Sequence, residues 1–93
     1  MDRSEMVKVL SEMATHQAAI YELEKRTGLF CIGTLDRPEI HIGTSHWDEV
    51  IETIKPATVT YNPLFSKAFT EAYFKMRLNG SVYKIFTLFA KED

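Results

Sequence analysis

The pair Asn79-Gly80, set between two runs rich in apolar residues, constrains the fold of this chain more than any other feature. Asn-Gly is the strongest two-residue signal for a β-hairpin, because a type I′ turn needs positive φ at both central residues. We therefore expect two antiparallel strands within residues 72–89. Their register pairs Leu78 with Ser81, Arg77 with Val82, Met76 with Tyr83, Lys75 with Lys84, Phe74 with Ile85 and Tyr73 with Phe86.

Alternation of side chains divides this hairpin into two faces. The face that we expect to join the core carries Ala72, Phe74, Met76, Leu78, Tyr83, Ile85, Thr87 and Phe89. The other face mixes cations with aromatic rings and carries Tyr73, Lys75, Arg77, Val82, Lys84, Phe86 and Leu88. Antiparallel sheets commonly expose such a face to water, and it is also the surface on which a partner could bind.

Residues 63–78 also fit an apolar helical stripe, with Asn62 as the N-cap, Pro63 in the first turn and Gly80 as the stop. Phe74 departs from that stripe, and the strand at residues 81–89 needs a neighbour. We favour the hairpin, preceded by a turn or a short helix over residues 63–69.

Composition indicates one domain over residues 1–93, since 45% of the residues are hydrophobic and the chain is too short for two cores. The net charge of −2 gives no general attraction to nucleic acid or to anionic membranes. Cys31 is the single cysteine, the first residues lack a signal-peptide pattern, and no apolar run approaches the roughly 20 residues of a membrane span. These features predict a cytoplasmic protein that does not bind membranes.

Residues 4–26 predict one long helix, part of an N-terminal segment over residues 1–27, with Ser4 as its N-cap and Gly28 as its stop. Its apolar seam consists of Met6, Val9, Met13, His16, Ile20 and Leu23. At ~1.5 Å per residue the helix is roughly 35 Å long, as wide as a compact chain of this size. Either it lies diagonally across the sheet, or a second copy covers the seam in a homodimer. Burial of His16 in such a dimer would disfavour its protonated form and weaken association at acidic pH.

The remaining residues, 28–93, predict a sheet with one short helix. We expect strands over Leu29–Leu35 and Ile40–Thr44, joined by a turn at residues 36–39, with Leu35 opposite Ile40. A helix opened by a Ser45/Asp48 capping box then runs to about residue 54, and a strand follows over residues 57–62. The fold class is α+β: a long N-terminal helix, then β-β-α-β-β-β, with a mostly antiparallel sheet and helices packed on one face.

No pattern of residues predicts an enzyme, a cofactor or a metal site. His41 and His46 are close in sequence, but one lies on a strand and the other begins a helix, and a closed zinc site needs four ligands. Cys31 lies on the opposite face of its strand pair from His41, and we interpret it as a small buried hydrophobe and not as a nucleophile. The four glycines are isolated, so there is no glycine-rich phosphate loop.

These observations favour a non-enzymatic protein-interaction module of the adaptor or inhibitor type, self-associating through the helix seam, as in small accessory proteins of bacteria or phage. The partner would bind the mixed face of the hairpin, at Tyr73, Lys75, Arg77, Lys84 and Phe86, or the acidic helix at residues 48–52. The alternative is a nucleic-acid-binding domain that uses the same five residues, because aromatic rings can stack on bases while cations neutralise phosphates.

Overall fold

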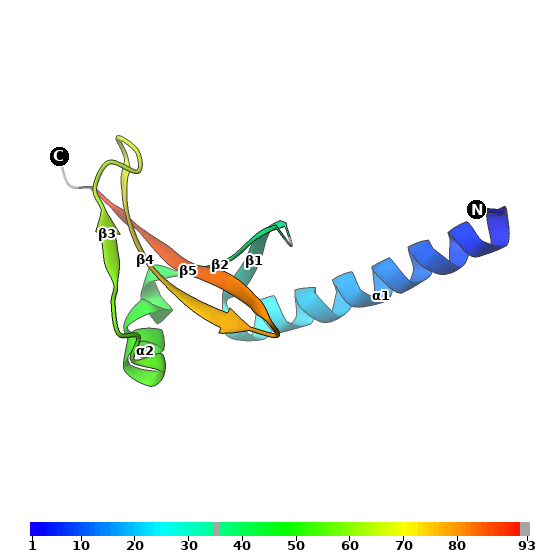
Figure 1. Ribbon diagram of the computed structural model, residues 1–93, viewed down its shortest axis with the longest axis horizontal. Helices are drawn as coiled ribbons and strands as arrows, with labels where there is room; N and C mark the ends of the chain where they lie inside the picture. The colour runs from blue at the N-terminus through cyan, green and yellow to red at the C-terminus, as the bar shows by residue number, and fades with distance from the viewer. Residues whose placement is uncertain (35, 92–93) are drawn as a thin grey trace.

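The computed structural model describes residues 1–34 and 36–91, and it has the predicted α+β class and order of elements (Figure 1). The elements are α1 (Arg3–Thr27), β1 (Leu29–Thr34), β2 (Arg37–Ile42), α2 (Thr44–Ile54), β3 (Thr60–Asn62), β4 (Phe69–Leu78) and β5 (Ser81–Ala90). The strands form one five-stranded sheet in the order β1-β2-β5-β4-β3. Only the β2–β5 pair among the described strands is parallel, so the sheet is mostly antiparallel as expected.

The β4–β5 hairpin forms in the predicted register, from Leu78 opposite Ser81 to Tyr73 opposite Phe86. Asn79 and Gly80 have φ of 50° and 82°, the positive values that the turn requires. The helical interpretation of residues 63–78 is therefore wrong. Residues 63–68 form turns and bends, in which the Leu64 N–H donates to the Asn62 side chain over 3.1 Å.

The predicted apolar face of this hairpin does form the core. Its buried members are Ala72, Phe74, Ile85 and Thr87, and Met76, Tyr83 and Phe89 pack around them. The Thr87 hydroxyl, although buried, donates a 2.6 Å hydrogen bond to the Ile42 carbonyl at the end of β2. A buried hydroxyl with a partner avoids the cost of desolvation, and this bond joins β5 to β2 beyond their ladder.

Helix α2 supplies the other side of the core. Trp47 is buried on its inner face, with its ring 5.8 Å from that of Phe74. The predicted Ser45/Asp48 capping box is wrong: the N-cap is Gly43, which has no side-chain capping bond. The N-cap lies two residues earlier than expected, and the helix ends as predicted at Ile54.

The β1–β2 pair differs in register from the prediction. Cys31 lies opposite Ile40 and Thr34 opposite Arg37, while Leu35, for which we predicted a pairing, lies outside the described residues. The turn is tighter than expected, so Pro38 lies within β2, before the first residue that pairs with β5. A proline is tolerated there because no β5 residue needs its missing N–H. The shift is four residues, an even number, so every side chain keeps its predicted face.

Helix α1 runs from Arg3 to Thr27 and projects away from the sheet, reaching it at β1 (Figure 1). Its N-cap is Asp2 and not the predicted Ser4, because the Asp2 carboxylate accepts a 2.8 Å bond from the Glu5 N–H. Gly28 ends it as predicted, with φ of 72°. Of the two helices in the described residues, only α2 covers the sheet, so the expectation that both helices pack on one face is wrong for α1. The molecule is elongated, 54 × 29 × 26 Å.

Candidate protein-interaction surfaces

The seam of α1 is the first candidate surface. The helix has no buried residue anywhere along Arg3–Thr27, all of which the structure describes. Its five apolar seam residues are each between 40% and 62% exposed: Met6, Val9, Met13, Ile20 and Leu23. Leu23 is 51% exposed although it lies only one turn before the body, so the seam remains open along the whole helix.

Contacts at the C-terminal end of α1 hold the helix on the body. The Glu24 carboxylate accepts a 3.0 Å hydrogen bond from the Cys31 N–H in β1. His46, in the first turn of α2, lies so close to Gly28 that a Cβ on the glycine would be 2.9 Å from its Nε2. The helix thus leaves the body at a junction shared by β1 and α2.

The second candidate surface is the face of the sheet opposite α2, here called the outer face. Directly paired residues of neighbouring strands share a face, so the ladder places Phe30, His41, Phe86 and Tyr73 in one row across β1, β2, β5 and β4. The rings of His41 and Phe86 are stacked, 4.9 Å apart and 7° from parallel. This row of aromatic rings crosses most of the sheet.

Lys84 lies at the centre of the outer face, where its amine contacts two carboxylates and two aromatic rings. Its Nζ lies 2.8 Å from a carboxylate oxygen of Glu71 and 3.9 Å from one of Glu39. On its way to Glu71 the side chain passes over the Tyr73 ring, with Nζ 4.8 Å from the centroid, and 5.7 Å from that of Phe86. Phe86 is consequently only 7% exposed, enclosed by His41 on one side and Lys84 on the other.

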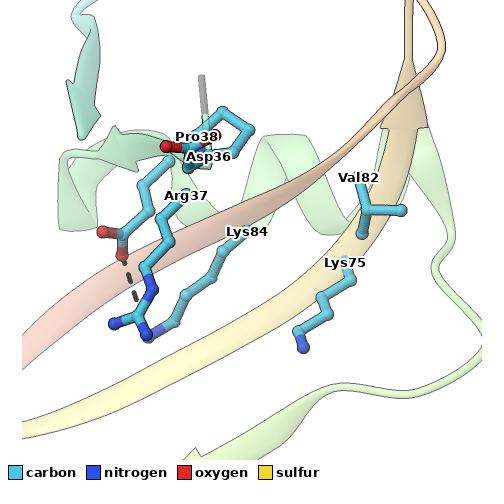
Figure 2. A pocket seen from close by; sticks show the side chains of 7 residues that line it. Asp36, Arg37, Pro38, Lys75, Val82 and Lys84 are labelled. Carbon is cyan, nitrogen blue, oxygen red and sulfur yellow. Dashed lines mark ion pairs between the residues drawn. The ribbon is translucent and has the colours of Figure 1, made fainter. Parts of the chain in front are cut away.

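A recess of about 440 Å³ opens beside Lys84, between the β1–β2 turn and the β4–β5 hairpin (Figure 2). The side chains that line it are Asp36, Arg37, Pro38, Glu39, Lys75, Val82 and Lys84. Three cations and two carboxylates line the recess, and the dashed line in Figure 2 marks the ion pair between two of them, Glu39 and Lys84. The recess is of mixed charge and also has the apolar side chains of Pro38 and Val82 in its lining.

All five residues predicted to bind a partner lie on the outer face, but they differ in availability. Lys75 and Arg77 are exposed and Tyr73 is half-buried, whereas Phe86 is buried and Lys84 is held by two carboxylates. Sequence reasoning missed these carboxylates, Glu39 and Glu71. The hairpin register already placed Glu71 on the face of Tyr73, but Glu39 depends on the parallel β2–β5 pairing, which no local signal predicts.

On the core face, beside α2, an apolar groove of about 630 Å³ remains. It extends to the end of α1, and its lining includes Arg26, Thr27, Leu29, Ile40, His46, Val50, Ile54, Met76, Leu78 and Ile85. The groove and the α1 seam therefore lie close to each other at the junction.

The two histidines considered as metal ligands lie on different faces. His41 stacks on Phe86 on the outer face, whereas His46 lines the groove on the core face. Within residues 1–34 and 36–91, no three His, Cys, Asp or Glu side chains are grouped so as to hold a metal ion. Cys31, expected to be buried, is exposed, because β1 is an edge strand that α2 does not cover.

In the part of the chain that the structure describes, neither helix is long and apolar enough to cross a membrane. The chain matches no protein-family model, no curated protein and no solved structure. Its function is therefore inferred from the geometry of its own surfaces.

Proposed function

We propose that this chain is a non-enzymatic protein-interaction module that self-associates through α1. The observation that carries the proposal is the exposure of the whole α1 seam along a 25-residue helix that projects from the body. Most helices in proteins owe their stability to the packing of an apolar face, and isolated helices are marginal in water. A second copy of α1 would supply that packing.

The outer face would then serve a different protein. Lys75 and Arg77 are exposed cations beside a half-buried Tyr73, and the neighbouring recess offers groups of both charges. Surfaces of this mixed character suit a folded partner that presents acidic side chains next to an apolar anchor. Asp48, Glu49 and Glu52, all exposed on α2, are a second surface, suited to the basic site of a protein that the chain would inhibit. A reducing compartment such as the cytoplasm suits the exposed thiol of Cys31.

Nucleic-acid binding by the outer face has weaker support. Of the two predicted stacking rings, Phe86 is enclosed and Tyr73 is half-buried, and of the three predicted cations Lys84 is neutralised by Glu71. Lys75 and Arg77 remain as exposed cations, and Arg37 in the recess is a third. Three cations are fewer than the roughly 6–10 phosphate contacts of strongly salt-dependent binding.

Light scattering coupled to size-exclusion chromatography tests self-association. We expect the native chain to elute as a dimer at micromolar concentration and Met13→Glu to elute as a monomer, since the charge would have to be buried in the seam. Ser11→Glu is the matched control, because it adds the same charge on the same helix away from the seam. A native chain that is monomeric at high micromolar concentration would refute the proposal.

A further inference from the structure

The spacing of the α1 seam is the same when read from either end. Its six positions are separated by three, four, three, four and three residues, a heptad pattern centred between Ala14 and Thr15. Met6, Met13 and Ile20 occupy one heptad position, and Val9, His16 and Leu23 the other. In an antiparallel pair of helices, each layer contains a residue of one heptad position from one helix and a residue of the other heptad position from its partner. This seam can therefore pair with a second copy of itself over its full length.

In that arrangement Met6 faces the partner's Leu23, Val9 faces the partner's Ile20, and Met13 faces the partner's His16. Every layer contains a flexible or branched apolar side chain, and the two histidines occupy separate layers. A parallel pair would instead place His16 against the partner's His16, putting two imidazoles in one layer. The antiparallel pairing therefore avoids a layer that holds two polar side chains.

The charges that flank the seam distinguish the two orientations further. Antiparallel pairing brings Arg3 beside the partner's Glu24 and Glu5 beside the partner's Arg26, which gives four pairs of opposite charge in the symmetric dimer. Arg3, Glu5 and Arg26 are exposed, and Glu24 is half-buried. Its Oε2 accepts the Cys31 N–H, and a carboxylate has further lone pairs for an arginine.

A parallel pair has no such complementarity. Its flanking positions would join Glu5 to Leu10, Glu12 to Gln17 and Ala19 to Glu24 of the two helices, none of which is a pair of opposite charges. Charge pairing at these positions sets orientation more than affinity. The flanks and the layers thus favour the same orientation.

We infer that two copies of this chain associate through α1 as an antiparallel helix pair, with their sheets at opposite ends. This inference rests on the proposed function and specifies its partner and register. At 1.5 Å per residue α1 is about 37 Å long and the seam within it about 26 Å, and the first turn of each helix reaches the partner's Arg26 and Thr27, which line the apolar groove. The dimer presents two outer faces, one on the sheet at each end, an arrangement that suits a repetitive or dimeric partner.

Site-directed crosslinking tests the orientation in the full chain. In a Cys31→Ser background, Val9→Cys and Ile20→Cys are prepared separately with different tags, then mixed, unfolded and refolded together, and oxidised. The antiparallel dimer places position 9 against the partner's position 20 and separates identical positions by roughly 16 Å, too far for a disulfide. We expect crosslinked species that carry both tags, and no crosslink in either variant alone.

The outcomes separate the two proposals. A monomer by light scattering refutes self-association itself. A dimer in which Val9→Cys or Ile20→Cys crosslinks to itself, or in which the mixture does not crosslink, refutes the antiparallel register and leaves self-association standing. Small-angle X-ray scattering gives an independent reading: the maximum dimension rises from the 54 Å extent of one chain to about 70 Å for sheets at opposite ends, and stays near 54 Å for a parallel pair.

Discussion

Lys84 and Glu71 form an ion pair of 2.8 Å across two strands of the outer face, and the Glu71 side chain is only 4% exposed. Burial makes this carboxylate dependent on its partner, because an unpaired buried charge is costly whereas the pair itself has modest value. The Lys84 Nζ also lies 5.7 Å from the centroid of the buried Phe86 ring, so one side chain both neutralises a carboxylate and lies over an aromatic residue.

Removing the lysine alone should therefore destabilise the fold more than removing both charges. We expect Lys84→Met to lower the free energy of unfolding by about 1–3 kcal/mol, and Lys84→Met with Glu71→Leu to recover most of that loss. Urea denaturation of the native chain, both single variants and the double variant measures the coupling. Lys75→Met, on the exposed neighbour opposite Lys84, is the control and should change stability by less than about 0.5 kcal/mol. Equal losses in Lys84→Met and the control would contradict this account.

The junction of α1 with the body predicts a contrast between two glycines. Gly28→Ala forces a side chain into positive φ and brings its Cβ to 2.9 Å from the His46 Nε2. Gly80→Ala imposes the same backbone penalty of about 1–2 kcal/mol, but no atom lies within 4 Å of the new Cβ. We expect Gly28→Ala to cost more in thermal or urea unfolding, and Gly28→Ala with His46→Ala to cost no more than Gly80→Ala. If the His46 change gives no relief, the contact does not constrain the junction.

Much of the fold follows from local signals. Asn79-Gly80 specifies the β4–β5 register completely, and Gly28 and Ile54 end their helices as predicted. The parallel pairing of β2 with β5 does not follow from local signals, because it joins residues more than 40 positions apart through contacts that no turn specifies. Leu29–Thr34 and its partner strand were predicted four residues out of register, since a side-chain period of two allows any even shift.

The two candidate surfaces also differ in whether local sequence signals predict them. The seam of α1 was evident from spacing alone, because helical periodicity depends only on the sequence. The chemistry of the outer face was not: the hairpin register placed Lys84 among aromatic residues, but its availability depends on Glu39 and Glu71. Charge neutralisation across strands is a property of tertiary structure.

Binding to nucleic acid can be tested directly on the outer face. We expect no salt-dependent binding of a fluorescent single-stranded oligonucleotide by anisotropy between 50 and 200 mM salt, because Arg37 in the recess and, among the five predicted residues, only Lys75 and Arg77 are exposed cations (about three phosphate contacts). These two are also the residues to change, since replacing Lys84 would disturb Glu71. Binding that weakens with salt and is lost in Lys75→Glu with Arg77→Glu would establish the alternative function.

His16 is the polar residue of an otherwise apolar seam, and replacing it tests whether that seam is buried. In the dimer its imidazole lies in a layer with methionine, where a polar group lowers stability but helps to fix the register. We expect His16→Leu to tighten association by roughly five- to tenfold, equivalent to about 1 kcal/mol. Sedimentation equilibrium of the native chain and of His16→Leu measures the two dissociation constants. If His16→Leu leaves the dissociation constant unchanged, His16 lies outside the interface and the seam is not the surface through which two copies meet.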